Sequence, residues 1–254
     1  MSELAILTAA LSPGVFLLFV FLRMDRFPEP RGVVLRTFVL GMVVVAPLVL
    51  ASIFFTPVLL VLAGTPAAGA FKALFMAGVL EELAKFWVLW GYCMRHSAFD
   101  EPMDGLVYGL TASLGFACLE NVMYLHAAGG EWASVAIARA LLAVPSHGFN
   151  GAIMGYYAAR GRFNPALRAD SYRKALLIPM ALHGAYDLGP LILQEVATDE
   201  GSPLAILGGL LALVAVVGIV LFEVAWTIRL FRRQRAAQIA PPPLPEIPWT
   251  PPVA

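Results

Sequence analysis

Residues 76–90 read MAGVLEELAKFWVLW, an apolar run that contains Glu81, Glu82 and Lys85. An ionisable residue at the centre of a bilayer costs at least ~2.5–3.5 kcal/mol on insertion scales, so such residues usually face the bundle interior and serve a site or pathway. Lys85 is one helical turn beyond Glu81, where it can neutralise that carboxylate. Gly78 shares this face and allows another helix to approach closely. The stretch therefore predicts a membrane-spanning helix with a polar site on one face.

The rest of the chain has the composition of a membrane protein. Its 254 residues are 60% hydrophobic and 13% charged, with a mean hydropathy of +0.80, whereas soluble domains carry roughly 25% charged residues. The formal net charge is zero, so no basic field indicates a nucleic-acid partner. Cys93 and Cys118 lie in apolar stretches and form no CxxC pair, which argues against a redox or structural zinc site.

Seven apolar stretches are long enough to cross a bilayer, which takes roughly 20 residues. We predict an all-α, polytopic transmembrane bundle of about seven spans, formed as a single domain by residues 1–235. The N-terminal segment has no basic region and carries Glu3, so we expect a span rather than a cleavable signal peptide. The second stretch is long enough to be broken at Pro47 or Pro57, or to be one span and a short re-entrant piece. The stretches are 4–22, 33–62, 71–94, 103–126, 132–159, 175–193 and 204–231.

The loops between these stretches alternate in charge. Lysine and arginine residues follow the first, third, fifth and seventh stretches, whereas the other loops are neutral or acidic. Because basic loops stay on the cytoplasmic side, this alternation predicts an N-terminus outside and a C-terminus in the cytoplasm. The tail, residues 236–254, is rich in proline, and we expect it to be extended and disordered.

The fourth apolar stretch carries a second polar face. Phe116, Glu120 and Tyr124 are four residues apart and therefore share one side of a helix. Glu120 lies roughly 10 Å deep at 1.5 Å per residue. Asn121 follows it and offers both a hydrogen-bond donor and an acceptor. Arg139, in the next stretch, lies at a matching depth, so we predict an ion pair between Arg139 and Glu120.

The fifth and sixth stretches each contain a histidine. His147 lies near the middle of the membrane and is followed by Gly151 and Gly155, whose spacing is typical of tight helix contacts. His183 and Asp187 are four residues apart, which suits a carboxylate that orients an imidazole and selects its tautomer. Both stretches therefore combine close packing with a group that can take part in acid–base chemistry.

Four of these polar groups reach one level of the membrane. Glu81, Glu82, His147 and His183 each fall roughly 15–22 Å from the outer surface at 1.5 Å per residue. Separate ion pairs are the alternative interpretation, but they leave one histidine and one glutamate without an obvious partner. We therefore predict one shared polar site. Glu223, in the seventh stretch, matches no motif, and we expect it to pair with a basic neighbour.

This set of residues supports two ways of activating water. One carboxylate can serve as general base while hydrogen-bond donors stabilise the oxyanion. Alternatively, Glu82, His147 and His183 can hold a zinc ion that activates its bound water. The helical HExxH motif is absent from the sequence, Ser146 cannot face its neighbour His147 on a helix, and Asp187 is the one membrane-embedded aspartate. Glutamate- and histidine-based hydrolysis remains, with or without a metal.

Two functions of other classes also use buried polar groups. A proton-coupled transporter or channel uses Glu, His and Lys chains as relays, but this chain is short and shows no internal repeat. A non-catalytic scaffold in a membrane complex can keep its polar groups apart. A hydrolase requires a shared, water-accessible cavity with Glu81 or Glu82 near both histidines, so the geometry of the site separates these alternatives.

Four short motifs lie in order along the apolar stretches, and together they resemble the PrsW family of intramembrane proteases over roughly residues 15–190. The segments DRFPEP (25–30) and DEPMDGLVYG (100–109) also look like family features. Each motif alone is weak evidence, whereas four in order form a strong signal. The motifs are EExxK at Glu81, Glu82 and Lys85; FxxxEN at Phe116, Glu120 and Asn121; a histidine with a glycine eight residues on, at His147 and Gly155; and HxxxD at His183 and Asp187.

The resemblance implies an intramembrane endopeptidase of the bacterial inner membrane. The family is distantly similar to CAAX-prenyl and abortive-infection proteases, in which paired glutamates and histidines activate water without a firmly required metal. It is also classed as a metalloprotease family, so Zn²⁺ stays open as a cofactor. The implied substrate is a single-span membrane protein such as an anti-sigma factor, cut first on the outer side in regulated intramembrane proteolysis. The sequence indicates no oligomeric state.

We predict eight catalytic or supporting residues. Glu81 or Glu82 is the general base, and the other glutamate orients the water or protonates the leaving amine. His147 and His183 position the water and stabilise the oxyanion. The supporting residues are Asn121, which assists; Asp187, which orients His183; Lys85, which holds the glutamate pair charged; and Glu120.

Overall fold

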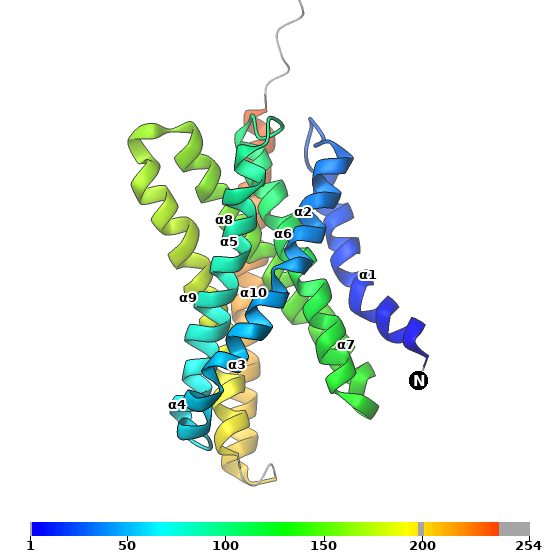
Figure 1. The fold of residues 1–254 in the computed structure, drawn as a ribbon, viewed down its shortest axis with the longest axis vertical. Helices are drawn as coiled ribbons and strands as arrows, with labels where there is room; N and C mark the ends of the chain where they lie inside the picture. The colour runs from blue at the N-terminus through cyan, green and yellow to red at the C-terminus, as the bar shows by residue number, and fades with distance from the viewer. Residues whose placement is uncertain (1, 198–200, 239–254) are drawn as a thin grey trace, which may run out of the picture.

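The computed structural model describes residues 2–197 and 201–238, and it shows helices that run along one long axis (Figure 1). The described residues contain no strand, so the predicted all-α bundle is confirmed. The last helix continues to Ala237, two residues past the predicted end of the domain at 235. The predicted disorder of the tail concerns residues that, from 239 onwards, lie outside the described part of the chain.

The helical rods coincide with the seven predicted stretches. Two of the rods contain a π-helical segment, η1 and η4, and three short 3-10 turns, η2, η3 and η5, lie between rods. In chain order the elements are α1 (Glu3–Leu22), α2 (Arg31–Val43), α3 (Val45–Leu62), α4 (Pro66–Ala70), η1 (Phe71–Glu81), α5 (Glu82–Gly91), η2 (Cys93–Arg95), α6 (Pro102–Ala127), η3 (Gly129–Glu131), α7 (Trp132–Ala138), η4 (Arg139–Ala143), α8 (Val144–Phe163), η5 (Pro165–Leu167), α9 (Arg168–Val196) and α10 (Pro203–Ala237).

Five helices are long and apolar enough to cross a membrane. They are Glu3–Leu22, Arg31–Leu62, Pro102–Ala127, Pro165–Val196 and Pro203–Ala237. The two remaining rods, 66–91 and 132–163, are the ones with π-helical segments. The described residues form seven helical rods, and the prediction that all seven cross the membrane stays a prediction.

The basic loops gather at one end of the bundle. Figure 1 shows the links 23–30, 92–101 and 164–167 at the same end as the last turn of α10. The N-terminus, the link 63–65 and the start of α10 lie toward the opposite end. This grouping agrees with the alternation of loop charges, and the orientation across a membrane stays a prediction.

The long second stretch is broken at Val44, between α2 and α3. Pro47 lies in the first turn of α3, where it has no N–H to donate and its ring crowds the carbonyl four residues earlier, at Val43. Pro57 lies inside α3 without ending it. The break expected at one of two prolines is therefore found next to Pro47.

Close helix packing brings the polar faces together around α6, whose residues from Met103 to Cys118 are all buried. A Cβ atom on Gly155 of α8 would collide with the backbone oxygen of Gly105 in α6, so the predicted tight contact is confirmed. A Cβ atom on Gly78 of η1 would lie 2.8 Å from the backbone oxygen of Met180 in α9. These approaches position the glutamates of η1 and α5 opposite the histidines of α8 and α9.

Candidate active site

Glu81 and Glu82 lie at a junction between two kinds of helix. Glu81 is the last residue of the π-helical η1, and Glu82 is the first residue of α5. π-Helical turns are rare and are frequent at functional sites. The side chain of Glu82 is fully buried, whereas that of Glu81 retains 18% exposure and lines a cavity. Two neighbours in sequence therefore have different surroundings.

Lys85 connects the glutamates to a histidine. Its Nζ atom lies 2.7 Å from Oε1 of Glu82 and 3.7 Å from Oε2 of Glu81. The same atom lies 2.9 Å from Nδ1 of His147 and 4.3 Å from the centre of the Phe116 ring. The predicted pairing with Glu81 is thus the looser of two ion pairs, and Glu82 is the closer partner.

The contacts of His147 select its tautomer. A lysine ammonium has only donors, so Lys85 donates to Nδ1 of His147. The ring proton then lies on Nε2, which is 2.9 Å from Oε2 of Glu120 and donates to it. His147 is therefore held between a cation and a carboxylate.

His183 is surrounded by carboxylates. Its Nδ1 atom lies 2.8 Å from Oε1 of Glu82. Its Nε2 atom lies 3.3 Å from Oδ2 of Asp187, as the i,i+4 spacing predicted, and 3.9 Å from Oε2 of Glu81. The rings of His147 and His183 meet edge to face with their centres 4.9 Å apart. The two histidines from separate helices thus form one site with both glutamates.

The predicted ion pair between Arg139 and Glu120 is confirmed. Arg139 also donates to Oδ1 of Asn121 and lies with its guanidinium carbon 4.0 Å from the centre of the Tyr124 ring. Asn121 donates from Nδ2 to the backbone oxygen of Ala10 in α1. Asn121 therefore contacts Arg139 and the backbone of α1, and its expected assistance to the reaction stays a prediction.

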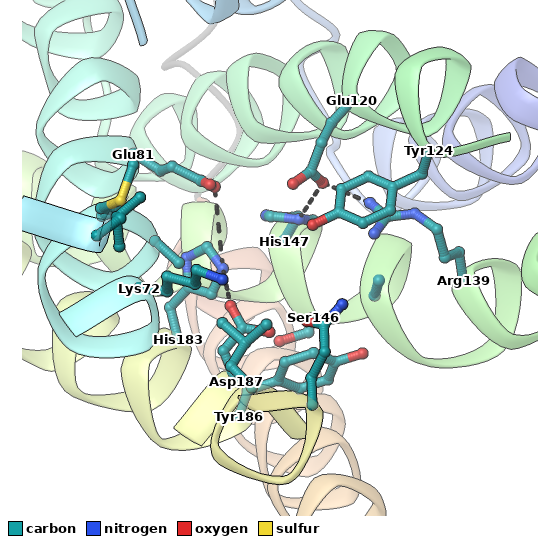
Figure 2. A pocket seen from close by; sticks show the side chains of 16 residues that line it. Lys72, Glu81, Glu120, Tyr124, Arg139, Ser146, His147, His183, Tyr186 and Asp187 are labelled. Atoms are coloured by element: carbon teal, nitrogen blue, oxygen red, sulfur yellow. Dashed lines mark hydrogen bonds and ion pairs between the residues drawn. The ribbon is translucent and has the colours of Figure 1, made fainter. Parts of the chain in front are cut away.

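A cavity of about 330 Å³ opens beside these groups (Figure 2). Glu81, His147 and His183 face it, and Figure 2 shows Glu81 and Glu120 approaching from opposite sides. Lys72 and Gln194 also line it, close to the ends of η1 and α9 that lie at the α4 end of the bundle. The predicted site is thus a shared cavity rather than a set of separate ion pairs.

Several residues of the cavity wall are not among the predicted site residues, and Lys72, Tyr186 and Ser146 are examples with polar side chains. Lys72 pairs with Glu195 near the mouth, and its position at the start of an apolar run gave no signal. Tyr186 directly precedes Asp187, so the HxxxD motif indicates where it lies, but the motif itself does not include it. Ser146 was considered only as a nucleophile.

Glu223 differs from the expectation. Its side chain is fully buried in α10, and no ion pair joins it to a lysine or arginine among residues 2–197 and 201–238. The expected basic partner is therefore wrong. The reason is geometric, because the arginines of α10 lie further along the helix, at its end.

One set of donors could hold a metal ion. A carboxylate oxygen of Glu81 and one nitrogen each of His147 and His183 lie within 4.8 Å of one another. Oε2 of Glu81 is buried and has no hydrogen-bond partner in the described chain. Two imidazoles and a carboxylate match the donors of catalytic zinc sites, which keep a further position for water. The set differs from the predicted one, because Glu81 takes the place of Glu82.

The site can therefore do acid–base chemistry on a bound water. It offers a partly exposed carboxylate, two oriented imidazoles, and a buried cation that balances the glutamates. Such a combination of general base and hydrogen-bond donors is what hydrolysis of an acyl bond requires. The shared cavity also fits a hydrolase better than a scaffold.

Comparisons with known proteins agree with this chemistry. The model of the PrsW family intramembrane metalloprotease matches residues 29–231. Protease PrsW of Geobacillus kaustophilus (strain HTA426) is 41% identical over 184 residues, which cover 72% of this chain and 78% of the relative. Protease PrsW of Bacillus subtilis (strain 168) is 40% identical over 185 residues, which cover 72% and 81%. No solved structure matches the chain significantly. The chain is a multi-pass membrane protease and belongs to the PrsW family of intramembrane metalloproteases.

Proposed function

We propose that this protease hydrolyses a peptide bond in or near the membrane segment of a single-span substrate, with water activated by Glu81. The observation that carries the proposal is the convergence of Glu81, His147 and His183 on one cavity inside the helix bundle, with donor atoms within 4.8 Å of one another. Family membership supports this reading over a transporter or a scaffold.

Glu81 is the general base in this proposal. It is the glutamate that faces the cavity, and Oε2 has no hydrogen-bond partner within the described chain, so it is free to accept a proton from water. The water oxygen then attacks the scissile carbonyl carbon. Glu81 passes the same proton to the leaving amine, so the proton balance closes within one residue. General acid–base catalysis of this kind contributes roughly 10²–10⁴-fold.

His183 orients the water and stabilises the oxyanion, and His147, whose Nε2 proton is donated to Glu120, supports the arrangement of the site. Nε2 of His183 is the ring nitrogen on the side of Glu81 and Asp187, where it can donate to an oxygen near Glu81. Glu82 binds the other nitrogen of His183, so the ring is held in place. His147 is held in turn by Lys85 and Glu120. Preorganised donors of this type favour the charge that develops during acyl transfer.

The zinc-dependent form of this reaction is a second candidate, favoured by the donor set Glu81, His147 and His183 and by the description of the family. A zinc ion held there would make its bound water a better nucleophile. Lys85 now donates to Nδ1 of His147, so an ion that used this nitrogen would displace the ammonium. In this form Glu82 and Asp187 keep their contacts to His183 and orient it as a ligand.

The substrate is proposed from the resemblance of the four motifs and from the position of the cavity. The cavity is lined by the histidines and also by Lys72 of η1 and Gln194 of α9. Lys72 follows α4, which lies at the end of the bundle opposite the basic links (Figure 1). With the orientation inferred from the loop charges, this end lies outside the cell. Access from that side supports a first, outer-side cut in an anti-sigma-factor-like protein of the bacterial inner membrane.

Cleavage by purified protein tests the proposal. The full chain is reconstituted in liposomes with a single-span test protein, and the products are identified by mass spectrometry. Wild-type protein should cleave it, and Glu81→Gln should not. Glu131→Gln serves as the matched control, because Glu131 is an exposed glutamate in η3, outside the cavity. Full activity of a folded Glu81→Gln variant would remove Glu81 from the reaction.

A further inference from the structure

A second polar cluster lies behind the wall of the cavity. Ser146 and Asn150 are four residues apart on α8 and share one face, and Glu223 approaches them from α10. These side chains are almost completely buried, with exposures of 3%, 1% and 0%. We call Ser146, Asn150 and Glu223 the inner cluster.

The side chains of Ser146 and Asn150 lie close to the carboxyl group of Glu223, but the polar atoms of the inner cluster are not joined by hydrogen bonds of normal geometry. Within residues 2–197 and 201–238, no hydrogen-bond partner is found for Oγ of Ser146, for Nδ2 and Oδ1 of Asn150, or for either carboxylate oxygen of Glu223. A buried polar group without a hydrogen bond is unfavourable, because it has lost its contacts with water and gained none in the protein. Five such atoms in one place require an explanation, and the usual one is water bound between them.

The inner cluster adjoins the catalytic groups. Ser146 lines the cavity, so one end of the cluster reaches the space in which hydrolysis takes place. The carboxyl group of Glu223 lies within electrostatic range of His183, Glu82 and Tyr186. Water bound in the inner cluster can therefore contact the cavity through Ser146.

We propose that Ser146, Asn150 and Glu223 bind buried water molecules that connect through Ser146 with the cavity, and that Glu223 is a positioning residue for the hydrolytic water. This role rests on the proposed hydrolysis. Glu223 touches neither substrate nor the reacting atoms, and it acts through the water it binds. No sequence motif includes Glu223, because the residues that it approaches lie on another helix.

The chemistry of the three side chains favours water over a cation. A hydroxyl, an amide and a carboxyl group present donors as well as acceptors. Water satisfies both kinds, whereas a sodium ion would satisfy the oxygens and leave Nδ2 of Asn150 without an acceptor. A buried water typically makes about three hydrogen bonds, which these side chains can supply.

Direct observation of water is the first test. An experimental structure of the full chain, at a resolution that shows ordered solvent, should contain water density bonded to Glu223 and Asn150. A dry cluster, or density that disappears when sodium is replaced by choline, would overturn the proposal. This readout does not depend on activity, so it stands apart from the test of the proposed function.

Kinetics is the second test. Glu223→Leu should lower kcat by between about 10-fold and 100-fold, because displacement of a reacting group costs factors of this order, while KM stays within twofold. Glu223→Gln keeps the hydrogen bonds and should restore most of kcat. Thr227→Val removes a buried hydroxyl one turn further along α10, where it donates to the backbone oxygen of Phe149, and should leave kcat unchanged.

The outcomes separate the two proposals. If the wild-type protein cleaves the substrate and Glu223→Leu has the same kcat, the positioning role of Glu223 is refuted and the proposed hydrolysis is not. If Glu223→Leu does not fold, Glu223→Gln still tests the positioning role, because glutamine keeps the hydrogen bonds and should retain most of kcat. A loss of kcat in Glu223→Gln as large as that in Glu81→Gln would refute the role. Loss of cleavage in every protein, wild type included, is a failure of the proposed function and leaves the water structure to decide the inner cluster.

Discussion

Nδ1 of His183 lies 2.8 Å from Oε1 of Glu82, a glutamate with no exposed side-chain surface. The same oxygen accepts a hydrogen bond from Lys85. Glu82 is therefore committed to two buried partners, whereas its neighbour Glu81 faces the cavity. The motif EExxK thus combines two tasks in adjacent residues, and the tasks can be separated by mutation.

Glu81→Gln and Glu82→Gln should fail in different ways. Glu81→Gln should reduce cleavage by roughly 10²–10⁴-fold, the contribution of a general base, with little change in melting temperature. Glu82→Gln leaves Lys85 buried without its closest carboxylate, and breaking a buried ion pair costs about 3–5 kcal/mol. Its melting temperature should therefore fall as well. Cleavage assays and thermal unfolding in the same detergent measure both effects, and an inactive but fully stable Glu82→Gln beside an active Glu81→Gln would reverse the assignment.

Glu120 and Arg139 should show strong coupling. Removing either charge leaves the other buried and unpaired, so Glu120→Gln and Arg139→Met should each destabilise the protein. Removing both charges should recover much of the loss, with a coupling of about 0.5–3 kcal/mol in a double-mutant cycle. Additive losses of stability in the double variant would show that the pair is energetically independent. Glu3→Gln, at an exposed pair with His126, is the control that should change little.

Metal removal distinguishes the two forms of hydrolysis. If zinc takes part, purified protein should contain about one ion per chain, chelation should abolish cleavage, and added Zn²⁺ should restore it. His147→Ala and His183→Ala should then lose the ion. If Glu81 acts alone as base, cleavage should continue in chelator with no metal bound. Elemental analysis and the chelator assay, performed on one preparation, decide between these outcomes.

Stability should depend on pH through Glu29, which lies outside the membrane-spanning helices. Burial raises the pKa of Glu29 to about 9 from its ordinary value of 4.5, and neighbouring Asp104 adds to the rise. The folded protein therefore keeps a proton that the unfolded chain loses between these two pH values. Stability from this group is complete below about pH 4.5 and falls as pH rises toward 9.

Glu29→Gln should remove that part of the pH dependence. Glutamine cannot ionise, and its oxygen can still accept the hydrogen bond that Tyr108 donates to Glu29. The melting temperature of the variant should exceed that of the wild type increasingly between pH 5 and pH 9, the window that the raised pKa defines. A constant difference across this range would contradict the shift.

The sequence predicted the elements of the site well because membrane helices have regular geometry. A spacing of four residues placed Glu81 with Lys85 and His183 with Asp187, and a rise of 1.5 Å per residue matched the depth of Arg139 to that of Glu120. Each of these contacts is found in the structure. The depth of a residue in the membrane and the helix face on which it lies both follow from its position along the chain.

The sequence could not predict which partner each group chooses across helices. Lys85 reaches His147 on another helix, and Glu223 meets Asn150 instead of a base. These choices depend on how the helices rotate and cross, and the spacing of residues along one chain does not determine either. The same limit explains why Glu81 rather than Glu82 joins the possible metal donors.

The π-helical turns before the site should make it sensitive to the number of residues in these segments. Both η1, which ends at Glu81, and η4, which ends four residues before His147, close hydrogen bonds one residue wider than an α-helix does. A π-helical turn holds one residue more than the α-helical turn that it replaces. Removing one residue would therefore let the segment relax to α-helix, and the wider turn before Glu81 or His147 would be lost. Deletion of Leu74 should therefore lower cleavage, whereas Leu74→Ala should have little effect, since Leu74 is half exposed. In these two segments we expect the number of residues to matter more for the site than the identity of an exposed side chain such as Leu74.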